Sequence, residues 1–175
     1  MPVTSSNPSL YDGFALYGSG VTLVTVRDDD VDQFFIAASV LTASVEPFSL
    51  AVAVGQHRIG LPAIMRGVPW AVSVLAVEHL PLVERLTGPT TRDERLAALI
   101  AAGAETSPEG PLWLPDALVS LWCRFSSVTP VHHQSLIVGD VTRGSVHREG
   151  LPLMRWNRQF TTACDAPSEV ALHAG

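Results

Sequence analysis

The stretch AASVLTASVEPFSLAVAVGQHR (residues 37–58) combines the composition of a buried sheet with an unusual number of polar groups. Three hydroxyl side chains, Ser39, Thr42 and Ser44, follow one another closely, and the apolar run after them ends in GQHR (55–58). A buried hydroxyl group needs a hydrogen-bond partner. The stretch therefore predicts either a bend between strands that these side chains cap or the wall of a polar ligand site.

The segments around this stretch predict further strands, because they are rich in β-branched and aromatic residues and are bounded by turn residues. The predicted strands are GVTLVTV (20–26), QFFIAAS (33–39), FSLAVAV (48–54), WAVSVLA (70–76), ALVSLWCRFSSV (117–128) and SLIVGDVTRGSV (135–146). The acidic run RDDDVD (27–32) predicts a hairpin turn, since adjacent carboxylates are not buried cheaply.

Helical patterns lie between these strands and before the first of them. They cover LYDGFALY (10–17), IGLPAIMRG (59–67), VEHLPLVERLTG (77–88) and TRDERLAALIAAG (91–103). About six strands joined mostly by short turns favour antiparallel pairing, and the helices do not alternate with every strand. The sequence therefore predicts a mainly β fold, a small antiparallel barrel with helical additions.

Composition limits the classes of partner. The chain has 175 residues, which fits one domain, and 47% of them are hydrophobic against 16% charged. This apolar surplus predicts a subunit interface. The net charge is −6 and no basic stripe is present, which argues against nucleic acid as a partner. No apolar run is long enough to cross a bilayer.

The cysteines and the two ends of the chain predict a cytoplasmic protein in a reducing compartment. Cys123 lies in an apolar strand and is expected to be a buried thiol, whereas Cys164 lies in a polar tail. Their spacing matches no metal site. Residues 1–9 are predicted to be a flexible N-terminus without a signal peptide, and residues 163–175 a C-terminal tail.

No motif of an independent catalytic centre is present in the sequence: there is no GxSxG, HExxH or GxxxxGK pattern. His132 and His133 are adjacent on a predicted hairpin, where neighbouring side chains face opposite ways and do not easily share a metal ion. No metal site is therefore expected. Either histidine alone could be a solvated residue or a hydrogen-bond donor.

The order of these segments resembles the flavin reductase-like family, the FMN-binding split barrels that include reductase components of two-component flavin monooxygenases. The resemblance runs from about Leu10 to Phe160, and we assign residues 10–162 to this single domain. It rests on GVTLVTV after a short helix, SVLTASVEP at the family's hydroxyl-rich stretch, WAVSVLAVEHLPLVERLTG, SLIVGDV and PLMRWNRQF (152–160).

The resemblance implies an antiparallel, Greek-key-like split barrel that forms a homodimer with FMN near the interface. The flavin ring would then lie against the hydroxyl-rich stretch, whose backbone and hydroxyl groups can bond its polar edge. The residues implied are Ser39, Val40, Leu41, Thr42 and Ser44. The alternative, that the hydroxyl groups cap a bend between strands, stays open here.

The family often carries N-R-S-S-x-T where this chain has GQHRIG (55–60). The resemblance implies that Gln56, His57 and Arg58 replace the hydroxyl donors at the flavin phosphate, with Arg58 able to bind it bidentately. The alternative is a solvated turn with a surface arginine.

The resemblance also points to the nicotinamide cofactor and to the C-terminal segment. His133 lies close to where the family has Asp-His before a strand, and is a candidate contact for NAD(P)H. Trp156 and Arg158 lie where the family has an aromatic, basic segment near the cofactor, although Trp156 could instead pack the barrel.

The function implied is an NAD(P)H-dependent FMN reductase, with FAD as the other flavin, that supplies reduced flavin to a partner monooxygenase. Hydride transfer would be carried by the flavin, so no general base is required. The alternative is a non-catalytic split-barrel dimer that binds flavin or another small ligand through a degenerate phosphate site. The sequence does not distinguish NADH from NADPH.

Overall fold

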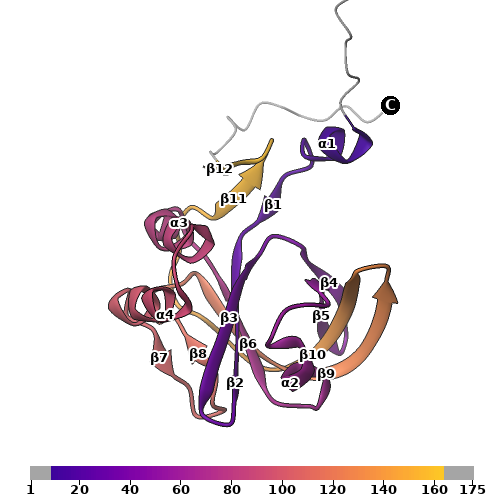
Figure 1. Cartoon of the computed structure of the whole chain (residues 1–175), viewed down its shortest axis with the longest axis vertical. Coiled ribbons are helices and arrows are strands. Elements are labelled where there is room, and N and C mark those ends of the chain that lie inside the picture. The colour runs from indigo at the N-terminus through magenta and orange to yellow at the C-terminus, as the bar shows by residue number, and fades with distance from the viewer. Residues whose placement is uncertain (1–8, 164–175) are drawn as a thin grey trace, which may run out of the picture.

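A seven-stranded antiparallel sheet, curved into an open barrel, forms the body of the protein in a computed structural model that describes residues 9–163 (Figure 1). The strand order is β3-β2-β6-β9-β10-β5-β4, so neighbours in the sheet are often distant in sequence. The strands are β2 (Thr22–Asp28), β3 (Val31–Ala37), β4 (Val40–Val45), β5 (Phe48–Gly55), β6 (Trp70–Val74), β9 (Val119–Val131) and β10 (Gln134–Val146). The predicted antiparallel split barrel is confirmed.

The barrel is split between its two edge strands, β3 and β4, which are not paired with each other. β3 lies at one end of the strand order and β4 at the other, and only Ala38 and Ser39 connect them. The strand β4 was not predicted, since its hydroxyl groups were interpreted as a bend or as a ligand wall. An edge strand tolerates such residues because one of its sides is not covered by the sheet.

Large apolar side chains fill the inside of the barrel, including Phe35, Trp70 and Ile137. Trp70 packs directly on Gly139 of β10, where a Cβ atom would lie 2.4 Å from the indole ring. Cys123 is fully buried in the same core, as predicted. Burial, assisted by the charge of Asp140, raises the pKa of its thiol to about 12.

Two helices cover the sheet from outside and enclose a second apolar core. These are α3 (Leu80–Thr87) and α4 (Arg92–Ala101), preceded by the short 3-10 turn Val77–His79 and followed by β7 (Glu105–Thr106) and β8 (Leu112–Trp113). The predicted helical patterns at 77–88 and 91–103 are confirmed. Thr91 and Glu94 form a capping box at the start of α4.

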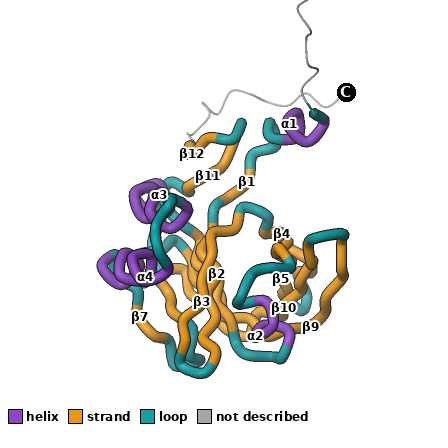
Figure 2. The backbone as a smooth tube through the Cα atoms, in the orientation of Figure 1, coloured by secondary structure: helices purple, strands orange, loops and turns teal. Residues whose placement is uncertain are grey.

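A small lobe stands above the barrel and contains both ends of the described chain (Figure 2). It consists of α1 (Leu10–Phe14), β1 (Ser19–Gly20), β11 (Leu153–Trp156) and β12 (Gln159–Thr162), with β11 between β1 and β12. We call α1, β1 and the residues between them the N-terminal arm (residues 10–20). The β11–β12 hairpin was not predicted.

The remaining predictions of segment boundaries agree in part with the structure. The predicted helix in 59–67 is the short α2 (Leu61–Met65). Ser9 caps α1, while residues 1–8 and 164–175, including Cys164, lie outside the described residues. Within residues 9–163, no helix is both long and apolar enough to cross a membrane.

Candidate functional site

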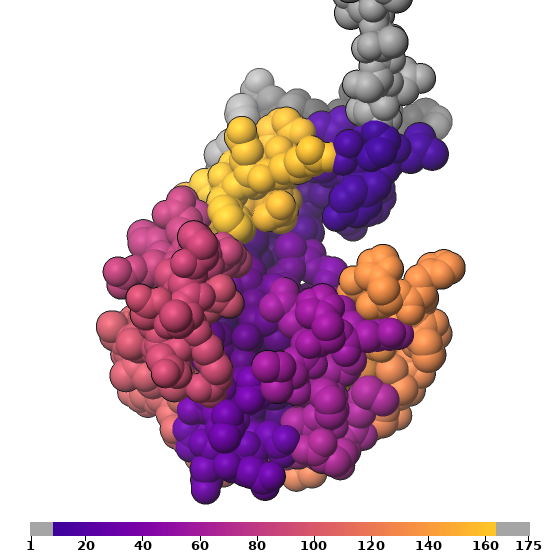
Figure 3. Space-filling view, in the orientation of Figure 1, coloured from indigo at the N-terminus to yellow at the C-terminus, as the bar shows by residue number. Residues whose placement is uncertain are grey.

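Two adjoining clefts open where the barrel is split. The smaller has a volume of about 180 Å³ and lies between β3 and β5, with Arg58 in its wall. The larger, of about 770 Å³, lies between the β3–β4 connection and the N-terminal arm. Both share walls formed by Ala38, Ser39 and Ala53. Figure 3 shows the hollow between the indigo arm and the barrel below it.

Ser39 lies at the junction of the two clefts. Its hydroxyl group donates to the carbonyl of Ala53 at 3.0 Å, and the amide of Ala53 donates to the carbonyl of Ser39 at 3.2 Å. The side chain thus caps the connection between strands and also lines both clefts, so the two interpretations of this residue are compatible. Val40 and Leu41 line the larger cleft.

The other two hydroxyl residues of this stretch lie further along the edge strand. Thr42 and Ser44 pair with Leu50 and Ser49 of β5, and neither lines a cleft. The structure therefore brings Ser39, Val40 and Leu41 to the candidate site but leaves Thr42 and Ser44 outside it.

The segment 55–58 forms a tight turn after β5, closed by the amide of Arg58, which donates to the carbonyl of Gly55 at 2.9 Å. His57 packs on Gly55, and both His57 and Arg58 line the smaller cleft. The Arg58 guanidinium lies 5.6 Å from the centroid of the Phe35 ring. No carboxylate of residues 9–163 forms an ion pair with it, so its charge is available to an anion.

Gln56 has a different role from the predicted one. Its side-chain nitrogen donates to the carbonyls of His132 at 3.0 Å and Gln134 at 3.3 Å, and its backbone amide donates to the carbonyl of His133. These bonds clamp the tip of the β9–β10 hairpin and occupy the donors that would bind a phosphate. Gln56 lines neither cleft.

His133 lies in the exposed two-residue turn of that hairpin, next to His132, whose φ of 51° places it in the left-handed region. Neither histidine lines a cleft, and Gln134 is the residue of this segment in the wall of the smaller one. His133 is therefore the sequence neighbour of a residue that lines the site, but it does not line the site itself.

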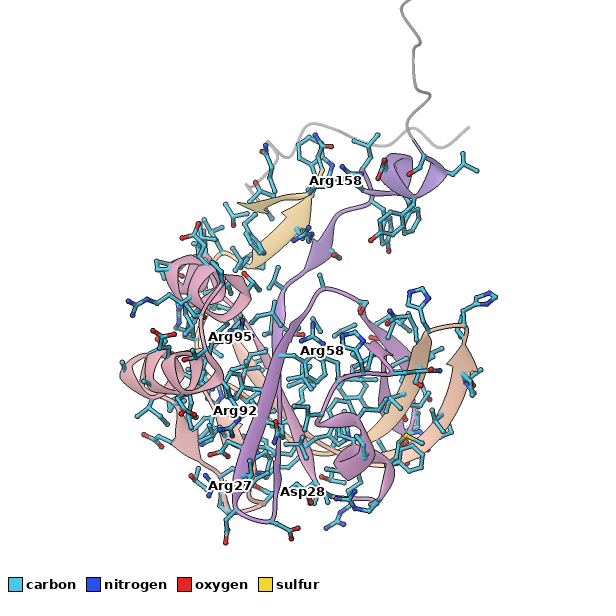
Figure 4. All side chains as sticks on the ribbon, in the orientation of Figure 1. Arg27, Asp28, Arg58, Arg92, Arg95 and Arg158 are labelled. Carbon is cyan, nitrogen blue, oxygen red and sulfur yellow. The ribbon has the colours of Figure 1, made fainter. Side chains whose placement is uncertain are left out.

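Trp156 and Arg158 attach the N-terminal arm to the β11–β12 hairpin. The indole nitrogen of Trp156 donates to the carbonyl of Leu16 at 3.0 Å, and Arg158 forms an ion pair with Asp12. Trp156 therefore packs on the arm and not inside the barrel, and it does not line either cleft. Arg158, labelled in Figure 4, lines the larger cleft, but its charge is already paired with Asp12.

Sequence reasoning missed most residues of the larger cleft, among them Tyr11, Phe14, Tyr17 and Arg155. The three aromatic residues lie in the segment 10–17, which was predicted only as a helix. Yet no residue of α1 is buried. The available signal was a cluster of aromatic residues close to the start of the chain, a place where a packed core is uncommon.

The residues present fit a flavin. Its flat ring needs a slot with polar groups at one edge, and the small residues Ala38, Ser39 and Ala53 line the junction of the two clefts. Its phosphate needs a cation, and Arg58 lies in the adjoining cleft. Within the described part of the chain, no group of three or more His, Cys, Asp or Glu residues is placed to hold a metal ion.

Comparison with known proteins gives a consistent result. Residues 14–163 match the family described as "Flavin reductase like domain". A relative from Streptomyces coelicolor named "Actinorhodin polyketide dimerase" is 29% identical, over 95% of this chain and 96% of its own. "FMN reductase (NADH) RutF 2" of Rhizobium rhizogenes is 26% identical, over 85% and 84%. The reductase component of 4-hydroxyphenylacetate 3-monooxygenase from Thermus thermophilus is 27% identical, over 85% and 91%.

Solved structures share the fold at low sequence identity. BorF, the flavin reductase component of a bacterial two-component tryptophan halogenase, superposes with a TM-score of 0.80 at 22% identity, covering 90% of this chain and 98% of its own. The NADH:FAD oxidoreductase SgcE6 of Streptomyces globisporus gives 0.78 at 18% identity, covering 97% and 96%. With most of its length matched, the chain belongs to the flavin reductase-like domain family.

Proposed function

We propose that this protein is an NADH-dependent flavin reductase that reduces FMN and supplies the reduced flavin to a partner monooxygenase. Relatives similar over most of the chain carry the names "FMN reductase (NADH)" and "reductase component" of a monooxygenase. The name "FMN reductase (NADH)" supports FMN as the flavin and NADH as the reductant, a choice that the sequence alone leaves open.

The observation that carries the proposal is the pair of adjoining clefts at the split of the barrel, with an unpaired arginine at one end. Arg58 would bind the flavin phosphate, while Ser39 and the start of β4 would lie against the ring. Bound flavin would supply the redox chemistry, accepting a hydride from the nicotinamide. The protein's task would be to hold the two rings in contact and to exclude water from them.

The small number of donors for the flavin phosphate suits a flavin that leaves after reduction. One arginine replaces the several donors of a typical phosphate loop, and Gln56 is engaged with the hairpin. Fewer bonds to the phosphate mean weaker binding. Weak binding would let the flavin act as a substrate that is exchanged with a second enzyme.

We further infer that two copies of the chain form a dimer through the edge strand β4. Its apolar side chains Leu41 and Val45 are exposed, Val45 by 79%, and so is Phe48 at the start of β5. An exposed apolar edge strand is a surface that soluble proteins normally cover. The substitution Val45→Glu would convert a dimer into a monomer in sedimentation or light scattering, and a wild-type monomer at all concentrations would refute the dimer.

The function can be tested by following NADH oxidation at 340 nm with purified protein, with and without added FMN. Turnover that requires both protein and FMN supports the proposal. Quenching of FMN fluorescence without turnover would instead support the alternative of a non-catalytic binding dimer. Absence of both turnover and quenching would refute a flavin site at the split of the barrel.

A matched pair of variants tests the role of Arg58. Arg58→Gln should weaken FMN binding by about 10-fold or more, because a charge-assisted hydrogen bond to the phosphate is lost. Arg124→Gln is the control, since Arg124 is also exposed, lies on β9 and lines neither cleft. Equal FMN affinity in the two variants would show that Arg58 does not bind the phosphate.

A further inference from the structure

Besides Arg58 in the smaller cleft, one further arginine without a bonded partner lines the larger cleft. Most arginines of the chain are bonded to a carboxylate, a carbonyl or a hydroxyl group, for example Arg27 to Asp32 and Arg143 to Glu109. In the part of the chain that the structure describes, the arginines without such a partner are Arg58, Arg85, Arg124 and Arg155. Of these, Arg58 lines the smaller cleft and Arg155 the larger one.

Arg155 lies on β11, opposite Ser19 of the N-terminal arm. Its guanidinium lies 5.6 Å from the centroid of the Phe160 ring. The neighbouring Arg158 is paired with Asp12, so that pair carries no net charge into the cleft. Arg155 is therefore the cation that this side of the cleft offers to a ligand.

The arm provides an aromatic surface in the same cleft. The rings of Phe14 and Tyr17 are stacked, with centroids 5.2 Å apart and planes 17° from parallel. Both residues line the cleft, yet they are 68% and 69% exposed. An exposed stacked pair leaves an aromatic face on which a planar ring can continue the stack.

The arm is fixed and does not merely lie near the cleft. The carbonyl of Leu16 accepts from Trp156, and the carbonyl of Ala15 accepts from the amide of Asn157 at 2.7 Å. These bonds hold the turn that carries Tyr17 against the β11–β12 hairpin, which also carries Arg155. The aromatic face of the arm and the free guanidinium of Arg155 are thus held in one lobe by hydrogen bonds between the arm and the β11–β12 hairpin.

We infer that Arg155, Phe14 and Tyr17 form a nucleotide-binding subsite for the adenosine diphosphate part of NADH, separate from the flavin phosphate site at Arg58. This inference rests on the proposed function. A purine base matches the aromatic face, and a pyrophosphate matches the guanidinium. The single phosphate of FMN is assigned to Arg58, so a second free arginine in the adjoining cleft calls for a second anionic ligand.

The test uses 5′-ADP as the probe and the full-length chain. Binding is measured by calorimetry in the absence of flavin, so the readout does not depend on turnover. Arg155→Gln should weaken 5′-ADP binding by about 10-fold. It should raise KM for NADH similarly and leave FMN affinity within about twofold, since the flavin phosphate is bound at the other end of the site. Arg124→Gln is the matched control and should behave as wild type.

Tyr17 gives a second, independent variant. Tyr17→Leu removes the ring and should weaken 5′-ADP binding, whereas Tyr17→Phe keeps the stacking surface and should retain it. Because Tyr17 is largely exposed, both variants should fold, which thermal unfolding would check.

Several results would overturn the subsite. One is a wild-type protein that does not bind 5′-ADP at millimolar concentration, and another is an Arg155→Gln variant that binds it as wild type does. A loss confined to 2′,5′-ADP would place Arg155 at a 2′-phosphate and overturn the pyrophosphate assignment. Binding of 5′-ADP that depends on Arg155, in a protein without flavin turnover, would support the subsite and refute the proposed function instead.

Discussion

Ser39 and Ala53 exchange two hydrogen bonds at the opening of the barrel, one through the serine hydroxyl group and one through the backbone. These bonds tie the β3–β4 connection to β5 at the one place where the two clefts share their walls. The junction is lined by the small side chains of alanine and serine, so a larger side chain there would separate the two clefts. Its size therefore controls whether one ligand can extend through both clefts.

Replacing Ser39 by phenylalanine should block the junction. The exposed position accepts the larger ring without disturbing the core, so the fold should persist while FMN affinity falls by more than about 10-fold. Fluorescence titration with FMN measures the affinity. Ser127→Phe, at an exposed serine of β9 that lines neither cleft, is the control. Equal FMN binding in the two variants would place the flavin elsewhere.

The contact between Gly139 and Trp70 predicts a large effect on stability. Gly139→Ala would bring a Cβ atom to 2.4 Å from a ring that is buried on all sides, so Trp70 or the strand must shift. We expect a loss of about 1–3 kcal/mol in the free energy of unfolding, measured by denaturant titration. Gly13→Ala should not lower stability, because nothing lies within 4 Å of that added methyl group.

Cys123 predicts how stability changes at alkaline pH. The pKa of its thiol is raised by burial to about 12, so the folded protein keeps a proton that the unfolded chain releases above about pH 8.5. Stability from this group is therefore fully present below that pH and is lost as the pH rises toward 12. In a Cys164→Ser background, adding Cys123→Ala should remove this part of the pH dependence. An unchanged slope of unfolding free energy against pH would contradict it.

The ion pair of Arg143 with Glu109 predicts an acid-sensitive contribution on the outer face of the barrel. Arg143 donates to both Glu109 oxygens, at 2.6 and 2.8 Å, and its guanidinium lies 3.4 Å from the ring centroid of Trp122. Hydrogen bonds from Arg143 lower the pKa of Glu109. Because both groups are partly exposed, Arg143→Gln should cost only about 1 kcal/mol at neutral pH.

The sign of the acid dependence follows from that lowered pKa. A carboxylate with a lowered folded-state pKa stabilises the fold above its unfolded pKa and loses this contribution as the pH falls through the folded value. The stability difference between wild type and Arg143→Gln should therefore shrink in acid. A difference that stays constant down to about pH 3, below the ordinary Glu value, would show that the contact with Trp122 alone is responsible.

Local patterns in the sequence predicted most of the barrel. The strand β2, the turn at Asp29 and Asp30, and the helix capped by Thr91 depend on β-branched composition, turn residues and capping. Such features could be predicted because each is determined by residues only a few positions apart. The resemblance to the flavin reductase-like family, and not these local patterns, pointed to Ser39 and Arg58, and both line the smaller cleft.

Only the tertiary structure decided which partners the other candidate residues bind. The amide of Gln56 bonds a hairpin 76 residues away, and Trp156 bonds Leu16 across 140 residues. No local pattern encodes such a pairing, because the partners are brought together only when the sheet closes around its core. The sequence by itself determined a mainly β, antiparallel fold and placed Arg58 directly after a core strand. Folding decided that Gln56 clamps a hairpin, that Trp156 braces the arm, and that Arg155 stays free in the larger cleft.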